Sequence, residues 1–299
     1  MRKLLVAVAV VLLAVLIGGC GNNGPQKKDG TLSVVTSFNA MSEFARAVGG
    51  ERVTVHTIIP DGTEPHDFEL KADDIKALSG ANVFIYNGLG MEPWAQGAVD
   101  AANNSHLTVI EASKNVEKLQ NTDLEEIEEH GQFDPHTWLS LRNAITEVTT
   151  IKEGLIAADP AGKDFYEANA AAYIAQLQAM DADYTVKFPT VPHKEFVTGH
   201  EAFGYLCRDY GLHQESVEDM FAEGEPNAAQ LAKLTQFAKD LGIKVIFAEK
   251  MASPEVSETL AKEIGAKVET LYTIESDEDG LTYIERMQSN LDKIYNSLL

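Results

Sequence analysis

Basic residues, cysteines and long apolar runs are all scarce in this chain. Its 299 residues include 24 Lys and Arg against 46 Asp and Glu, for a formal charge of −22. Such a surface repels nucleic acid and attracts cations only diffusely. The one long apolar run, Leu4 to Ile17, has 14 residues, fewer than the roughly 20 that cross a bilayer, so we expect no transmembrane helix in the mature protein. An apolar content of 44% nevertheless allows a sizeable core, and the length suggests two domains.

The N-terminus has the pattern of an export signal, because two basic residues precede the apolar run and small residues follow it. The residues from Ile17 to Cys20 resemble the lipobox of bacterial lipoproteins, in which the cysteine becomes the acylated N-terminus. We therefore expect a signal peptide at 1–19, a lipid on Cys20 and a flexible, lipidated tether at 20–30. The alternative is an ordinary cleaved signal that leaves a soluble secreted protein.

The cysteine count excludes a disulfide framework. Lipidation of Cys20 leaves Cys207 as the single thiol of the mature chain, so stability must come from the core. Cys207 lies among apolar residues at helical spacing, which favours a small buried side chain over a ligand or a nucleophile. Loss of the two basic residues of the signal brings the formal charge to about −24.

Strand-like and helical segments alternate in two halves of the chain, which predicts parallel sheets flanked by helices. Residues 160–189 have apolar residues at helical spacing and neither Pro nor Gly between Gly162 and the final Pro, which predicts one long helix. We therefore predict an α/β fold of two lobes, 31–158 and 189–299, joined by a connecting helix at 159–188. The strand-like runs are LSVVTS, VTVHTII, NVFIYNG and LTVIEA in the first half, and KEFVTGH, KVIFAE and KVETLYTI in the second.

Four side chains that can bind a metal fall at the ends of predicted strands or in strand-like turns, two in each lobe. Open parallel sheets bind ligands beyond the carboxyl ends of their strands, so this placement is informative. The four are His66 in PDGTEPHDFEL, His136 in FDPHTWLS, His200 at the end of EFVTGH, directly before a helix expected from Glu201, and Glu275 after KVETLYTI. Each alone would be read as a solvated or core residue.

The other histidines are not expected to bind metal. His56 alternates within a predicted strand, and we expect it to be partly buried or exposed there. His106, His193 and His213 lie in polar connections and are expected to be solvated.

Six segments carry a resemblance to a known family: PDGTEPHDFEL, NVFIYNGLGMEPW, DPHTWLS, VTGHEAFGYLCRDYGL, EGEPNAAQLAKLTQFAKDLGIKVIFAEKMASPEVSETLAKEIGAKV and YIERMQSNLDKIY. In this order they are similar to those of the solute-binding lipoproteins of zinc and manganese ABC importers, over residues 31 to the end. The resemblance implies two α/β lobes around a long helix, with a metal in the cleft. It also implies a monomer on the outer face of the bacterial cytoplasmic membrane, held by the lipid on Cys20, with an ABC permease and ATPase as partners.

The resemblance also implies the ligands. His66, His136 and His200 match the first three. At the fourth position Glu275 fits the zinc-type members, whereas Ile274 stands where some relatives have Asp. Asp277 and Asp279 are the alternatives.

Three imidazoles and one carboxylate suit Zn²⁺, which binds such ligands in a tetrahedron at roughly 2.0 to 2.1 Å. Mn²⁺ prefers more oxygen donors, and in the resembling manganese proteins the third His position is a carboxylate. His200 therefore favours zinc over manganese, making the chain a zinc-type member. The ligands alone do not select against Cu²⁺ or Ni²⁺.

The same four ligands disfavour an enzyme, because a hydrolytic zinc keeps one position open for water. The zincin pattern is also incomplete, since Gly204 stands where HEAFG would need a second His. A zinc hydrolase stays an alternative if Glu275 lies apart from the three imidazoles. Adhesion to a host or partner protein is a further alternative that no residue pattern supports.

Three more expectations concern the surroundings of the site. Asp67 and Asp134 are placed to accept a proton from a ligand imidazole or a loop amide. The acidic segment at 121–130 is either a solvated loop or a weak collector of cations. The long helix should resist wide hinge closure, so we expect small loop and lobe adjustments rather than a large swing.

Overall fold

The computed structural model describes residues 30–121, 127–128, 131–220, 228–249 and 255–299. The predicted signal peptide, Cys20, nearly all of the tether and most of the acidic segment lie outside these residues. The chain divides into two units, 1–31 and 32–299, and the following concerns the second unit. Among the described residues no helix is both long and apolar enough to cross a membrane.

The first sheet consists of four parallel strands, as the alternating pattern predicts. Its central strand β3 reads VFIY and is buried on both faces, whereas the edge strand β2 alternates between half-buried and exposed residues, so that His56 is exposed. The strands are β1 (Leu32–Thr36), β2 (Val53–Thr57), β3 (Val83–Tyr86) and β4 (Thr108–Glu111), in the order β2-β1-β3-β4. The helices of this half are α2 (Asn39–Gly49), α3 (Ala72–Ser79) and α4 (Ala95–Ala102).

The second sheet repeats this strand order, as β6-β5-β7-β8, again all parallel. The strands are β5 (Glu195–Thr198), β6 (His213–Ser216), β7 (Val245–Glu249) and β8 (Lys267–Leu271), and the helices are α8 (Gly204–Tyr210), α9 (Ala228–Leu241) and α10 (Glu255–Ile264). Strand β6 was not predicted, because its sequence HQES is short and polar. His213 is exposed as expected, but it lies in this edge strand rather than in a connection. The helix predicted from Glu201 begins at Gly204 instead.

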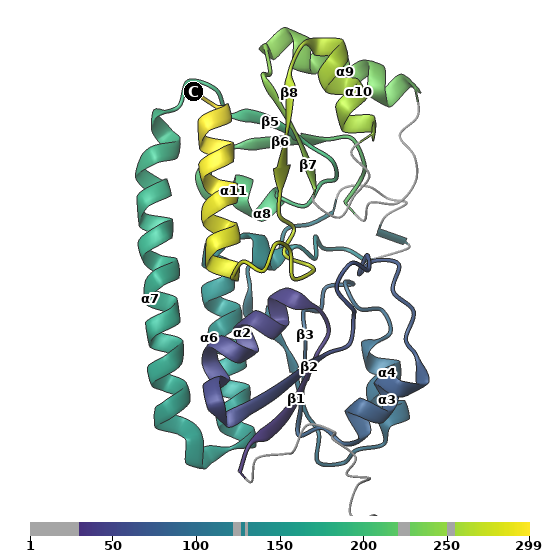
Figure 1. The fold of residues 1–299 in the computed structure, drawn as a ribbon, viewed down its shortest axis with the longest axis vertical. Coiled ribbons are helices and arrows are strands. Elements are labelled where there is room, and N and C mark those ends of the chain that lie inside the picture. The colour runs from purple at the N-terminus through teal and green to yellow at the C-terminus, as the bar shows by residue number, and fades with distance from the viewer. Residues whose placement is uncertain (1–29, 122–126, 129–130, 221–227, 250–254) are drawn as a thin grey trace, which may run out of the picture. The chain divides into compact units, whose positions relative to one another are not determined.

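The predicted long helix is α7 (Lys163–Lys187), whose 25 residues correspond to about 37 Å at 1.5 Å per residue. Short 3-10 turns at Pro160–Gly162 and Phe188–Thr190 replace the ends of the predicted span. Helix α7 contacts α6 (Leu141–Ala158), α2 and the C-terminal helix α11 (Tyr283–Ser297), so it touches elements of both halves (Figure 1). The Ser140 side chain caps the N-terminus of α6 by accepting a hydrogen bond from Asn143 N.

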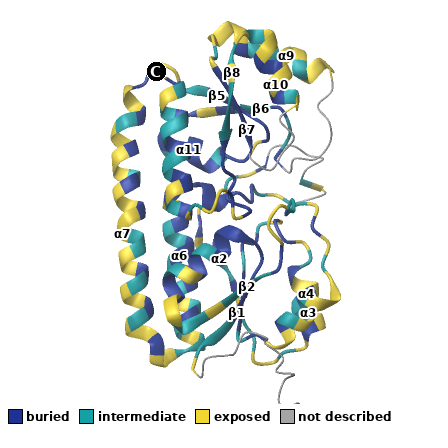
Figure 2. Cartoon of the chain, viewed as in Figure 1, coloured by how far each residue is buried: buried dark blue, intermediate teal, exposed yellow. Residues whose placement is uncertain are grey.

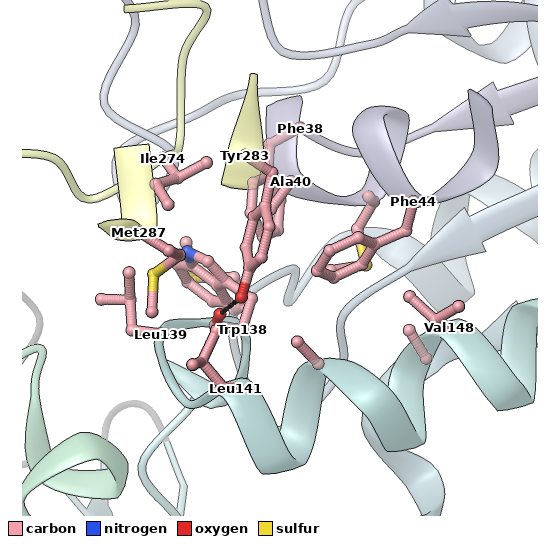
Figure 3. Packing of buried hydrophobic residues seen from close by; sticks show 14 of the residues in the cluster. Phe38, Ala40, Phe44, Trp138, Leu139, Leu141, Val148, Ile274, Tyr283 and Met287 are labelled. Carbon is pink, nitrogen blue, oxygen red and sulfur yellow. Dashed lines mark hydrogen bonds between the residues drawn. The ribbon is translucent and has the colours of Figure 1, made fainter. Parts of the chain in front are cut away.

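Buried aromatic side chains join the two halves of the unit (Figure 3). Phe38 and Trp138 pack edge to face at 4.7 Å between ring centroids, and so do Phe44 and Tyr283. The hydroxyl of Tyr283 donates to the carbonyl of Trp138 at 2.6 Å, and the Trp138 indole donates to the carbonyl of Thr273 at 2.7 Å. Residues of α2 and α11 and the side chain of Trp138 therefore belong to one cluster of buried residues, and Figure 2 shows buried residues on both helices. Cys207 is a buried free thiol, as predicted.

Candidate metal centre

The four residues predicted as metal ligands lie together. One nitrogen or oxygen atom from each of His66, His136, His200 and Glu275 lies within 4.8 Å of the others. The Nε2 atoms of His66 and His136 are 3.3 Å apart. A tetrahedral ion with bonds of roughly 2.0 Å places its ligand atoms about 3.3 Å apart. The first pair therefore already has the spacing of a tetrahedral edge, and the whole set needs only a small contraction.

The four residues differ in their access to solvent. His66, in the loop after β2, is half-buried, whereas His136, His200 and Glu275 are at most 5% exposed. The backbone N–H of His66 lies 3.3 Å from Oε1 of Glu64, to which it donates. Burial raises the pKa of the Glu64 carboxyl group. Sequence reasoning assigned no role to Glu64.

Asp134 contacts both the backbone and the ring of His136. Its Oδ1 accepts the backbone N–H of His136 at 2.8 Å and lies 2.9 Å from Nδ1 of the imidazole. A proton on Nδ1 would donate to Asp134 and leave the lone pair of Nε2 toward His66, whose Nε2 is 3.3 Å away. Asp134 is buried, whereas Asp67 is exposed. The role expected of Asp67 stays a prediction.

Asn87, which follows β3, is hydrogen-bonded to both neighbours of His136 in the turn that contains this histidine. Its side-chain Nδ2 donates to the carbonyl of Pro135 at 2.8 Å, and its Oδ1 accepts from the hydroxyl of Thr137 at 2.9 Å. The backbone N–H groups of Asn87 and Gly88 both donate to the carboxylate of Glu92 at 2.9 Å. Sequence reasoning missed Asn87, because its partners are about fifty residues away in the chain.

His200 presents an unpaired nitrogen to the cluster. Its Nε2 atom is buried and has no hydrogen-bond partner among the described residues. Burial, followed by the nearby His136, lowers the pKa of His200 to about 3, so the ring is neutral and its lone pair is available near pH 7.

Glu249, at the end of β7, fixes the backbone of His200. Its Oε1 accepts from the N–H groups of Gly199 at 3.1 Å and His200 at 3.2 Å, and lies 3.8 Å from Nδ1 of the ring. Burial raises the pKa of Glu249 to about 8. Sequence reasoning missed this residue, although an acid that ends the buried run VIFA was a visible signal.

Glu275 is positioned by a turn in which Ile274 has a φ of 61°, an uncommon conformation for a β-branched residue. Its Oε2 accepts from the hydroxyl of Thr273 at 2.6 Å, while the buried Oε1 has no partner among the described residues. Burial raises the pKa of Glu275 well above its usual value. The alternatives Asp277 and Asp279 are exposed and do not belong to the cluster that the described residues form.

Two α/β halves, with three imidazoles and one carboxylate converging between their sheets, define a two-lobed protein with a site for a divalent cation. Residues 34–297 match the family described as "Zinc-uptake complex component A periplasmic", and the chain belongs to this family. The predicted family resemblance and fold class are thereby confirmed. The members of this family are components of metal transport outside the cytoplasm, and the family is not a family of enzymes.

Named relatives agree with this assignment. The chain is 38% identical over 304 residues to the high-affinity zinc uptake system protein ZnuA of Bacillus subtilis, covering 95% of this chain and 94% of that protein. It is 37% identical over 292 residues to the zinc-binding lipoprotein AdcA of Streptococcus pneumoniae, covering 94% of this chain and 58% of that protein.

A solved structure shows the same fold. The laminin binding protein Lmb of Streptococcus agalactiae is described as a bifunctional protein with adhesin and metal transporting activity. It superposes with a TM-score of 0.83 at 34% identity, covering 90% of this chain and 100% of that one.

Proposed function

We propose that this protein captures one Zn²⁺ ion with His66, His136, His200 and Glu275 and delivers it to the permease of an ABC importer. The ion is the transported cargo rather than a resident cofactor. The proposal is supported by membership in the zinc-uptake family and by the geometry of the cluster.

The observation that carries the proposal is a pair of buried atoms without partners. Nε2 of His200 and Oε1 of Glu275 belong to two of the four clustered residues, and neither atom makes a hydrogen bond with the described residues. Buried polar atoms in proteins nearly always have a partner, because an unpaired one costs about 1–3 kcal/mol. A divalent cation bound between them would satisfy both atoms at once.

The donor set favours zinc over manganese. Three neutral imidazoles and one carboxylate give four ligands of the types that tetrahedral Zn²⁺ accepts, whereas Mn²⁺ prefers a larger share of oxygen. With one carboxylate the bound site has a net charge of +1. Glu64 lies nearby, but its carboxylate is not among the clustered ligand atoms.

We infer that the site has no catalytic role. Four protein ligands fill the tetrahedral shell, so an attacking water would have to displace one of them. This closure suits a protein that holds an ion until a partner accepts it.

We further propose that the mature chain is a lipid-anchored monomer on the outer face of the cytoplasmic membrane. The lipobox-like residues before Cys20 support this, as does the lipoprotein AdcA among the relatives. A permease that binds the open form more tightly than the closed one would shift the population toward release.

Native mass spectrometry with stoichiometric metal competition tests the site. The wild type should retain one zinc, and His200→Ala and Glu275→Ala should each lose most of it. His213→Ala is the matched control, because its imidazole is exposed on β6 outside the cluster, and it should retain zinc like the wild type. Retention of one zinc by both site variants at unaltered strength would refute the proposed ligand set.

A further inference from the structure

Helix α8 begins four residues after His200 and is fastened to the segment that carries His136. The side chain of Tyr205 is completely buried. Its hydroxyl donates to the carbonyl of Asp134 at 2.7 Å and accepts the backbone N–H of Leu119 at 3.2 Å. Asp134 and Leu119 are themselves paired, since Asp134 N donates to Leu119 O at 3.1 Å. One hydroxyl group therefore ties α8 to two facing segments of the first half.

Asp134 contacts both Tyr205 and the proposed metal ligand His136. Its Oδ1 contacts the backbone N–H and the ring Nδ1 of His136, as described above, and its carbonyl accepts from Tyr205. Its other carboxylate oxygen lies so close to Gly204 that a Cβ atom there would be 2.8 Å away. Helix α8 thus contacts Asp134 through both the backbone and the side chain of that residue, and Asp134 in turn orients His136.

The next turn of α8 extends the contact. The guanidinium group of Arg208 lies 5.1 Å from the centroid of the Tyr205 ring, and its NH1 donates to the carbonyl of Glu117 at 2.9 Å. The hydroxyl of Ser140, the N-cap of α6, donates to Asp209. Together Tyr205, Arg208 and Asp209 form a polar contact between α8 and the first half, here called the α8 latch.

The two proposed ligands from the second half, Glu275 and His200, differ in the partners of their backbone groups. Glu275 is tied directly to the first half, because its carbonyl accepts from Asn39 N at 3.2 Å and the buried Arg286 donates to the Asn39 side chain at 2.8 Å.

The backbone of His200 instead bonds within the second half. Its N–H donates to Glu249, and its carbonyl accepts from Thr198 and Gln214. The α8 latch is therefore a contact between the helix that follows His200 and the segment that carries His136.

We propose that Tyr205 is a positioning residue for metal retention: its hydroxyl keeps the His200 segment beside His136, and opening of this bond withdraws His200 from the ion. This inference rests on the proposed function. The opening is local, because α7, α11 and the Glu275 loop keep their contacts. It therefore fits the small adjustments expected from the long helix.

The test compares two phenylalanine substitutions on the same helix. Tyr205→Phe removes the latch hydroxyl and keeps the ring. Tyr210→Phe is the matched control. The Tyr210 side chain is also buried, and its hydroxyl donates to Asp181 at 3.0 Å, away from the His136 segment. Zinc dissociation is followed by stopped flow with an excess of chelator, and exchange of the Leu119 amide is followed in the metal-free protein.

We expect Tyr205→Phe to release zinc about tenfold faster than the wild type, because it loses one buried and one partly buried hydrogen bond. The Leu119 amide, which loses its acceptor, should exchange faster in the same variant. Tyr210→Phe should lose thermal stability without either change. Equal dissociation rates for the two variants would overturn the latch while leaving the zinc function intact, whereas a wild type that binds no zinc would overturn both.

Discussion

Replacement of Asn87 by alanine tests whether the support behind His136 matters for metal binding. Asn87→Ala removes the side-chain hydrogen bonds to Gly88, Pro135 and Thr137 and leaves two buried carbonyls without this donor. Three neutral hydrogen bonds at about 0.5–1.5 kcal/mol each predict a loss of about 2–4 kcal/mol in the free energy of unfolding. Urea titration of the metal-free protein measures this loss.

The matched control is Asn104→Ala. The side chain of Asn104 also donates to two backbone carbonyls, those of Leu78 and Ala81 at 3.1 and 2.8 Å. These carbonyls lie at the end of α3 and not in the turn that contains His136. Both variants should be destabilised, and Asn87→Ala alone should weaken zinc binding in a chelator competition. Equal zinc affinities for the two variants would refute the reasoning, because they would show that the turn at His136 keeps its geometry without Asn87.

Three further predictions follow from the same structure. Zinc binding should release a proton from Glu275, whose pKa is raised by burial, and calorimetry in buffers of different ionisation enthalpy should show this release in the wild type but not in Glu275→Gln. Burial raises the pKa of Glu147 to about 8, above its value in the unfolded chain, so its contribution to stability is complete below about pH 4.5 and is lost as the pH rises toward 8. Urea midpoints of the metal-free protein should therefore fall less between pH 5 and 8 in Glu147→Gln than in the wild type. Gly199→Ala should lose about 1–3 kcal/mol of stability and bind zinc more weakly, because its Cβ would lie 1.8 Å from Glu249 Oε2. Gly97→Ala in α4, with no atom within 4 Å of the new Cβ, should instead gain about 0.5–1 kcal/mol; unfolding curves that rank these two variants the other way would contradict the packing argument.

The sequence predicts most of the fold because its strands are buried in parallel sheets and read as apolar runs. Strand β6 escapes this rule, since HQES lies at a sheet edge and is held by backbone bonds to β5. The start of α8 was placed too early for a related reason. The residues from Glu201 to Phe203 are taken up by the turn that follows His200, whose bonds to Asp219 and Gln214 are not visible in local spacing.

The candidate ligands were visible because strand ends converge at one edge of a parallel sheet. Among the residues that contact these ligands, Asp134 was expected from its place beside His136, whereas Asn87 and Glu249 were not identified. Asn87 and Glu249 each act across long separations in the chain, and no local pattern pairs Asn87 with Pro135 or Glu249 with His200. The turn at Ile274, with its positive φ, also contradicts local propensity, and only the tertiary contacts of the Glu275 loop account for it.

The four proposed ligands differ in exposure, because His66 is half-buried whereas His136, His200 and Glu275 are buried. If the four residues bind Zn²⁺ as proposed, a hydrated ion arriving from solvent would first meet the half-buried His66 and would exchange its water molecules for protein atoms as it moves inward. The last of these exchanges would take place against His136 and His200, deep in the protein. Binding and retention of the ion would therefore depend on different residues. A substitution of His66 should change the rate of metal binding more than the rate of metal dissociation.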